Sequence, residues 1–117
     1  MNFHMKWRYI MSAVKGSKYV LGDVPLDKMS EFFKVMSDKT RLKILVELLG
    51  GSMCVMHISE RVGMSQSATS HQLAILRKAD LVRVKRNGKS IVYSISDEHV
   101  RLMLDMALLH LGEEGKI

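Results

Sequence analysis

The chain has one cysteine and one proline, and it lacks any long hydrophobic run. A single cysteine, Cys54, cannot form a disulfide within a chain, so the cysteine content gives no indication of export. No apolar run approaches the roughly 20 residues of a membrane-spanning helix. The start of the sequence also lacks the continuous apolar segment and the clean cleavage site of a signal peptide. These absences predict a cytoplasmic protein.

The composition instead indicates one domain with an excess of positive charge. The sequence has 117 residues, of which 47% are hydrophobic, as is ordinary for a globular domain. Lys and Arg number 18 against 12 Asp and Glu, which gives a formal charge of +6. A basic domain is typical of proteins with a polyanionic partner, although the same charge could simply aid solubility.

Proline and periodicity divide the chain into three parts. Residues 1–24 mix basic, aromatic and small side chains without clear periodicity and are interpreted as an N-terminal arm. Pro25 marks a boundary, so we expect one folded domain over 25–114, followed by a tail at 115–117.

Apolar residues at helical spacing predict five helices within this domain. Ser37 or Asp38 could cap the start of the second helix and Ser65 the start of the fourth, while Gly63 ends the third. The expected helices cover residues 26–37, 38–51, 55–63, 65–80 and 97–111.

A β-hairpin is predicted over residues 81–95. Asn87-Gly88 lies there between two β-rich runs, which is a strong hairpin signal. A two-residue turn at this dipeptide would pair Arg86 with Lys89, Val84 with Ile91, and Val82 with Tyr93. Only two residues separate the third and fourth helices, so the order of elements predicts a mainly α fold with a β-hairpin, the winged helix-turn-helix.

The fourth helix has the pattern of a DNA-reading helix. On a helical wheel, the side expected to face the core holds Ala68, Gln72, Ile75, Leu76 and Ala79. The opposite side has short side chains near its start and cations near its end: Ser67, Ser70, His71, Ala74, Arg77 and Lys78. Short side chains let a helix approach the major groove, and cations meet phosphates. Gln66, at the start of the helix, could read adenine through paired hydrogen bonds.

The basic hairpin is the second half of this signal. Lys85, Arg86 and Lys89 could follow the DNA backbone or enter a minor groove. A solvated serine-rich helix and a plain exposed hairpin are the alternatives, but serine is a poor residue for a helix interior. The two features in succession therefore indicate double-stranded DNA as the partner.

The last helix is apolar on two faces. The stripe expected to pack on the chain's own core holds Val100, Leu104, Ala107, Leu108 and Leu111. A second stripe holds His99, Leu102, Met103, Met106, His110 and Glu113. A helix buried on two faces needs a second partner, and the simplest partner is another copy of the chain related by a two-fold axis.

Potential metal ligands lie near both ends of this helix. His99 and His110 point the same way but are ~16 Å apart along the helix axis, so one ion with Zn–N distances of ~2.0–2.1 Å cannot contact both. If two helices pair antiparallel, Asp97 and His99 of one chain face His110 and Glu113 of the other. This set suits tetrahedral Zn²⁺, with Co²⁺ or Ni²⁺ also acceptable.

Simpler interpretations of the same residues exist. Asp97 could merely favour the helix N-terminus, and His110 and Glu113 could form an ordinary pair at i and i+3. A zinc hydrolase is the least favoured alternative, because four protein ligands close the coordination shell that a catalytic zinc keeps open. We therefore expect no enzymatic activity.

Taken together, these segments resemble the ArsR/SmtB family of winged-helix metal-sensing repressors over about residues 26–114. The resemblance is carried by "MSDKTRLKILVELL" (36–49), "MSQSATSHQLAILRKADLV" (64–82), "KRNGKSIVYSI" (85–95) and the Asp-x-His … His-x-x-Glu pattern of the last helix. It implies a homodimer, formed through N- and C-terminal helices, whose metal-free form occupies an inverted-repeat operator. It further implies that zinc bound across the dimer lowers DNA affinity and derepresses genes of metal efflux or sequestration.

The chain departs from the family at a second metal site, which uses Cys-Val-Cys. Here the sequence reads Cys54-Val55-Met56-His57, so a thiolate-rich site is not expected. His4, Cys54 and His57 could still form a secondary metal site, or Cys54 could simply be a small, partly buried residue. A metal-independent or redox-responsive DNA-binding regulator, acting through Cys54, is the alternative function.

Overall fold

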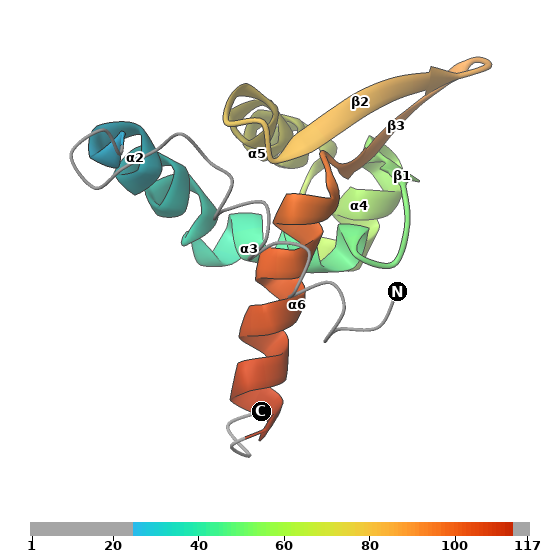
Figure 1. Ribbon diagram of the computed structural model, residues 1–117. Helices are drawn as coiled ribbons and strands as arrows, with labels where there is room; N and C mark the ends of the chain where they lie inside the picture. The colour runs from blue at the N-terminus through green and yellow to red at the C-terminus, as the bar shows by residue number, and fades with distance from the viewer. Residues whose placement is uncertain (1–24, 114–117) are drawn as a thin grey trace.

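The computed structural model describes residues 25–113, except for the side chain of Glu113. Within these residues the fold is mainly helical with one small sheet, and all five predicted helices are present (Figure 1). None of these helices is long and apolar enough to span a bilayer. The elements are α2 Leu26–Met36, α3 Lys39–Leu48, β1 Met53–Cys54, α4 Val55–Val62, α5 Gln66–Lys78, β2 Val82–Asn87, β3 Ser90–Ile95 and α6 Glu98–Glu113.

Short-range capping interactions set the helix ends. The Asp38 carboxylate accepts a hydrogen bond from the Arg41 N–H at 3.0 Å, so Asp38 rather than Ser37 caps α3. The Ser65 hydroxyl accepts one from the Ala68 N–H at 3.0 Å and caps α5, as predicted. Gly63 ends α4 in the left-handed conformation with φ 73°, which glycine adopts without steric cost.

Helix α3 lies at the centre of the hydrophobic core. Its buried residues Ile44, Leu45 and Leu48 pack with apolar side chains from every helix around it and from the hairpin. The other buried members of this core are Met36, Ile58, Val62, Leu73, Leu76, Leu81, Val82, Ile95, Val100 and Leu104.

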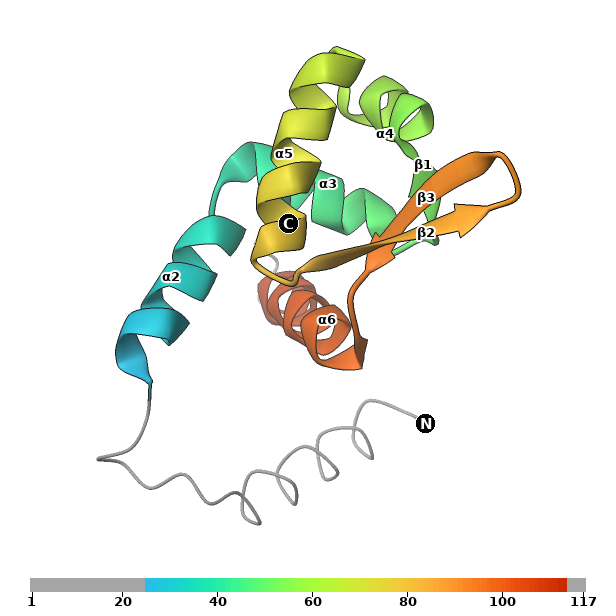
Figure 2. The ribbon, with the colours of Figure 1, turned by 90° about the horizontal axis from the view of Figure 1, so that it is seen from above.

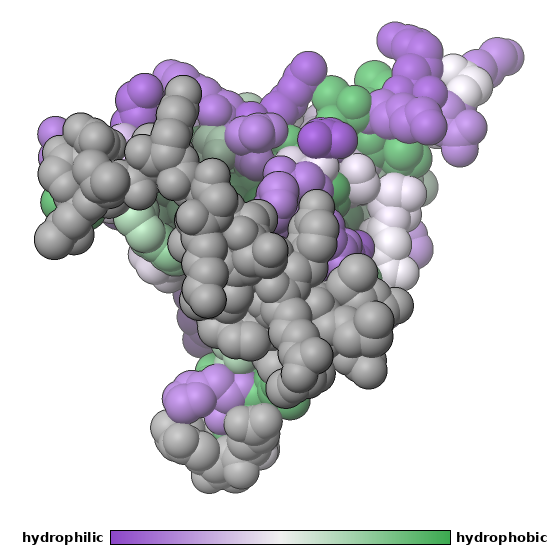
Figure 3. Space-filling view, viewed as in Figure 1, coloured by the Kyte–Doolittle hydropathy of each residue, from purple (hydrophilic) through white to green (hydrophobic). Residues whose placement is uncertain are grey.

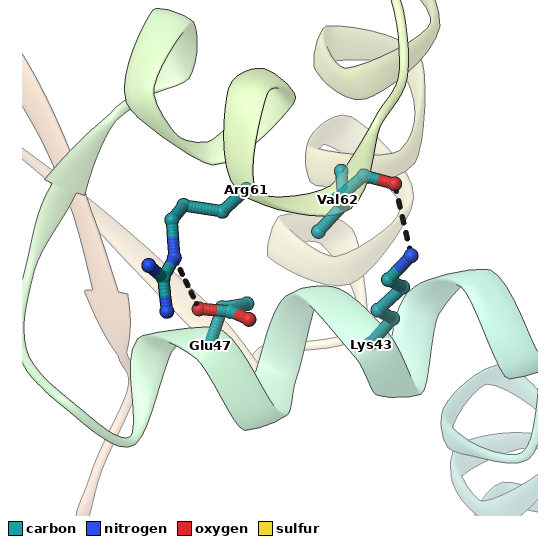
Figure 4. Close-up of polar contacts among 4 residues, drawn as sticks. All are labelled: Lys43, Glu47, Arg61 and Val62. Carbon is teal, nitrogen blue, oxygen red and sulfur yellow. Dashed lines mark hydrogen bonds and ion pairs between the residues drawn. The ribbon is translucent and has the colours of Figure 1, made fainter.

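Two polar contacts hold α4 against α3 (Figure 4). Lys43 donates from Nζ to the carbonyl oxygen of Val62 at 3.1 Å, and Arg61 Nε lies 3.0 Å from Glu47 Oε2. A cation at the C-terminal end of a helix is also favoured by the helix dipole. The first helix of the helix-turn-helix is therefore fixed to the core helix by side chains as well as by packing.

The sheet has three antiparallel strands in the order β1-β3-β2. Strand β1 pairs Met53 with Tyr93 and Cys54 with Val92. It was not predicted, because two residues carry no alternation that a sequence pattern could detect. Figure 2 shows the β2–β3 hairpin extending sideways from the helices, with β1 beside β3.

The predicted register of the hairpin is wrong by two residues. The turn is formed by Gly88 and Lys89, and a positive φ of 66° occurs at Gly88 but not at Asn87. This is the Gly-X turn, whereas a turn centred on Asn87-Gly88 would require positive φ at both residues. A shift of two residues keeps every side chain on its predicted face. The observed pairs include Arg86 with Ile91, Val84 with Tyr93, and Val82 with Ile95.

Helix α6 packs on the domain over its first half and projects beyond it over its second half (Figure 1). Val100 and Leu104 are buried in the core, as predicted, and Leu102, which was assigned to the second stripe, is also buried. The core of one chain ends before the apolar pattern of the helix does. The predicted burial on the chain's own core is therefore wrong for Ala107, Leu108 and Leu111, which are exposed.

The left-handed turn at Gly63 gives a test of the helix-turn-helix connection. Replacing Gly63 by Ala introduces no clash, because nothing lies within 4 Å of the added Cβ, but the φ of 73° is strained for alanine. We expect Gly63→Ala to lower the free energy of unfolding by about 1 kcal/mol, measured by urea denaturation at a fixed protein concentration.

Gly50→Ala is the matched control. Gly50 has no positive φ, and its added Cβ would meet Glu47 O at an ordinary 3.5 Å. We expect unchanged or slightly higher stability, because alanine restricts the unfolded chain. Equal losses in both variants would contradict the strained-turn explanation.

Candidate nucleic-acid interface and metal ligands

Helix α5 is seated on the core by one face. Thr69, Leu73 and Leu76 are fully buried, at spacings of four and three residues, and the Thr69 hydroxyl donates to Ser65 O at 2.8 Å. Gln72 and Ile75 border this face and are half-buried. The prediction that Ala68 faces the core is wrong, because the buried face is centred on Thr69 and Ala68 lies about 100° away from it.

The opposite face of α5 is open, as predicted. Figure 3 shows hydrophilic residues along the upper edge of the molecule, where Figure 1 places α5, and at the hairpin tip. Within residues 25–112, no hydrogen bond or ion pair engages the side chain of Arg77 or Lys78, so both cationic groups are open to a ligand. The exposed residues of this face are Gln66, Ser67, Ser70, His71, Ala74, Arg77 and Lys78.

The hairpin that follows α5 presents a second group of cations. Lys85, Arg86 and Lys89 are all exposed. Because of the corrected register, Lys89 lies in the turn itself, and Arg86 pairs with Ile91 near the tip. The two basic groups, on a helix end and on a hairpin tip, match the two places at which a winged helix meets DNA phosphates.

A cleft of about 380 Å³ separates the DNA-reading helix from the hairpin. Sequence reasoning missed one of its residues, Tyr93, which the sequence placed only as a pairing partner of Val82 in the hairpin. Its phenol can donate a hydrogen bond to a phosphate, and its position on an otherwise aliphatic strand face was the one available signal. The cleft is lined by Ser70, Leu73, Ala74, Arg77, Lys78 and Tyr93.

Two of the four predicted metal ligands lie together at the start of α6. His99 Nδ1 is 3.5 Å from Asp97 Oδ1, and the His99 side chain is 77% exposed. The same Asp97 oxygen accepts a hydrogen bond from the Val100 N–H at 3.0 Å, so Asp97 also caps the helix. The capping interpretation and the ligand interpretation of Asp97 are therefore compatible, because its second oxygen is not used by the cap.

The other two predicted ligands lie at the opposite end of α6. His110 is exposed, and Glu113 is the last residue of the helix, with its side chain outside the described residues. Across the described part of one chain, no three His, Cys, Asp or Glu side chains are grouped closely enough to hold a metal ion. One chain thus brings Asp97 to His99 but does not bring either of them to His110.

Two of the three residues of the predicted secondary metal site lie within the described part of the chain. Cys54 is half-buried in β1, and His57 is exposed on α4. His4 lies outside the described residues.

A helix-turn-helix with an open, basic second helix, followed by a basic hairpin, defines a winged helix-turn-helix DNA-binding protein. Comparison with known proteins identifies the group more closely: the model of the "Bacterial regulatory protein, arsR family" matches residues 38–84. The chain belongs to the ArsR/SmtB family of transcriptional regulators, and it is not an enzyme.

Two curated relatives and one solved structure illustrate the similarity. The HTH-type transcriptional regulator NmtR of Mycobacterium tuberculosis is 42% identical over 91 residues, which cover 74% of this chain and 76% of NmtR. The cadmium resistance transcriptional regulatory protein CadC homolog of Staphylococcus aureus is 35% identical over 94 residues, 80% of this chain and 77% of the homolog. The homodimeric winged helix-turn-helix DNA-binding domain Mb0332 of Mycobacterium bovis has a TM-score of 0.72 at 26% identity, covering 81% of this chain and 93% of that one.

The hairpin cation Arg86 tests the DNA interface. We expect Arg86→Gln to weaken binding to operator and random-sequence duplexes alike, because a phosphate contact carries no sequence information. The slope of log affinity against log salt should fall by about one unit per bound subunit. Fluorescence anisotropy across a salt series measures both effects.

Arg61→Gln is the control, because it removes the same charge from a side chain that is paired with Glu47 on the α3–α4 side. Its salt slope should equal that of the unsubstituted protein. A slope that falls equally in both variants would mean that total charge, rather than the hairpin, governs binding.

Proposed function

We propose that this chain is a metal-responsive transcriptional repressor. Its metal-free homodimer would occupy an inverted-repeat operator, and binding of Zn(II) between the subunits would release the DNA and derepress genes of metal efflux or sequestration. The proposal rests on one observation: the predicted metal ligands lie at opposite ends of α6. An Asp97–His99 pair lies at one end of α6 and His110 lies at the other, on a helix whose second half has no partner within the described chain.

Exposed apolar side chains support the dimer. Leu108, Leu109 and Leu111 are 37–41% exposed on the projecting half of α6. Leu26 and Phe33 are exposed on α2, which fits an interface formed by both ends of the domain. Large apolar residues left exposed on two helices favour a protein partner, and a second copy related by a two-fold axis is the simplest. Mb0332, the similar solved structure, is homodimeric.

The donor set fits zinc. Two imidazole nitrogens and two carboxylate oxygens are ligands that Zn²⁺ accepts in a closed tetrahedral site, and imidazole-containing sites also accept Co²⁺ or Ni²⁺. Asp97 and His99 would hold the ion together with His110 and Glu113 of the second subunit. The cap formed by Asp97 fixes its carboxylate at the helix start, which supports a role for Asp97 as one of the proposed ligands.

The family relationship also supports a metal-linked role and a cytoplasmic location. The CadC homolog is named for cadmium resistance, which agrees with a metal-linked role for a similar chain. A regulator of this kind acts on DNA, so we infer that it works in the cytoplasm.

Removing His110 tests the metal site. We expect the metal-free His110→Ala protein to bind operator DNA normally. His110 is in the last turn of α6, and this end of the helix projects away from α5 (Figure 1). Zinc should weaken DNA binding by the unsubstituted protein about 5- to 150-fold, the usual range of allosteric coupling, and should have no effect on the variant. Anisotropy titrations on an operator duplex, with and without zinc, measure this.

His57→Ala is the control, because it removes an exposed histidine of α4 that belongs only to the secondary candidate site. It should retain the full zinc response. Normal zinc release by His110→Ala would refute the assignment. A flat response from the unsubstituted protein would favour the metal-independent or redox-responsive alternative.

A further inference from the structure

A buried serine joins the end of the DNA-reading helix to the start of α6. Ser96 is 2% exposed and immediately precedes Asp97. Its hydroxyl donates to the carbonyl oxygen of Asp80 at 2.6 Å, and its N–H donates to the carbonyl oxygen of Leu81 at 3.1 Å. Asp80 and Leu81 follow Ala79, the C-cap residue of α5. One residue therefore holds both carbonyls at the exit of the reading helix.

The exit of α5 is a strained, tightly closed turn. Asp80 has a φ of 59°, in the left-handed region that a residue with a side chain rarely adopts. The Leu81 N–H donates back to Leu76 O at 2.9 Å, which closes the last turn of the helix. Leu76 and Leu81 are fully buried. Neighbouring contacts must hold Asp80 in this unfavourable conformation. The two hydrogen bonds donated by Ser96 are among these contacts, so they help to set the direction in which α5 ends.

The other side of Ser96 is equally well fixed. Asp97 caps α6 through the Val100 N–H and lies beside His99. One turn further on, Arg101 Nη1 donates to Leu49 O at the end of α3, at 2.9 Å. The first turn of α6 is thus bound to the core helix, while the residue just before it is bound to the reading helix.

We propose that Ser96 is a positioning residue for DNA recognition: it sets the orientation of α5 relative to α6, and so couples the dimer helix to the reading face. In a two-fold dimer, the two reading helices must match half-sites about 34–36 Å apart. A loosened α5–α6 junction widens the range of spacings that the pair of helices samples. The contribution of Ser96 to zinc release rests on the proposed function, but its contribution to operator binding does not.

Ser96→Ala tests the proposal on the full-length dimer. We expect metal-free binding to an inverted-repeat duplex, selected from a random pool by the unsubstituted protein, to weaken about 3- to 10-fold, the range for one lost hydrogen bond. Binding to a random-sequence duplex should not change, because the cations are untouched. Zinc affinity, measured by competition with a chromophoric chelator, should also be unchanged, while the zinc-induced loss of operator affinity becomes smaller.

Ser59→Ala is the matched control. Ser59 is also buried, at 5% exposure, but its hydroxyl donates within α4 to Met56 O at 2.7 Å. The control should keep the ratio of operator to random-duplex affinity. An unchanged ratio in Ser96→Ala, or an equal fall in both variants, would overturn the positioning role. If the unsubstituted protein shows no zinc binding, the proposed function fails, and the ratio still decides the role of Ser96.

A measurement on the unsubstituted protein covers the case in which Ser96→Ala does not fold. Hydrogen exchange at the Ser96 and Leu81 amides should slow when the operator duplex binds, because Ser96 donates across the junction to Leu81 O and Leu81 donates to Leu76 O at the end of α5. The Gly63 and Met64 amides, which donate to Ser59 O within the α4 end, serve as the reference. Slowing at the reference alone would overturn the proposal.

Discussion

The length of α6 is the constraint on which the proposed sensor depends. His99 and His110 are separated by eleven residues of continuous helix, which is ~16 Å along the axis. A helix cannot fold back on itself, so one subunit cannot bring its own two ends to one ion. The same helix leaves the hydrophobic core after Leu104, and its remaining leucines are exposed. The ligand geometry and the exposed leucines of α6 thus both favour a second copy of the chain as the partner of this helix.

The DNA-reading helix α5 and the last helix α6 are both bonded to the same central part of the domain. Helix α3 holds α4 through Lys43 and Glu47, and it receives Arg101 of α6 at its own end. Ser96, just before α6, adds a hydrogen bond to the carbonyl oxygen of Asp80 just after α5. Under the proposal, a change at α6 would reach the DNA-reading helix through these two partly buried contacts.

Local signals in the sequence were sufficient for most of the fold. The caps at Asp38 and Ser65, and the left-handed Gly63, depend on near neighbours, so the helix ends could be predicted. The predicted hairpin register was wrong because Gly88 fits a turn at Asn87-Gly88 as well as a turn at Gly88-Lys89. Which turn forms depends on how the residues of the two strands pair. Periodicity showed that α6 has apolar faces, but it could not show where the core of one chain ends. Asp97 and His99 were placed together by their spacing alone, whereas the position of Tyr93 beside α5 and the junction at Ser96 depend on contacts between distant segments.

The central claim is that each zinc site is divided between two subunits, and subunit mixing tests it most directly. One variant carries Asp97→Ala and His99→Ala, and the other carries His110→Ala and Glu113→Ala. Neither homodimer would keep a complete site, but a heterodimer of the two would keep one. We predict that tight zinc binding, absent from each variant alone, appears when the two are unfolded together and refolded, at one ion per heterodimer. If heterodimers form and still bind no zinc, the divided site is contradicted.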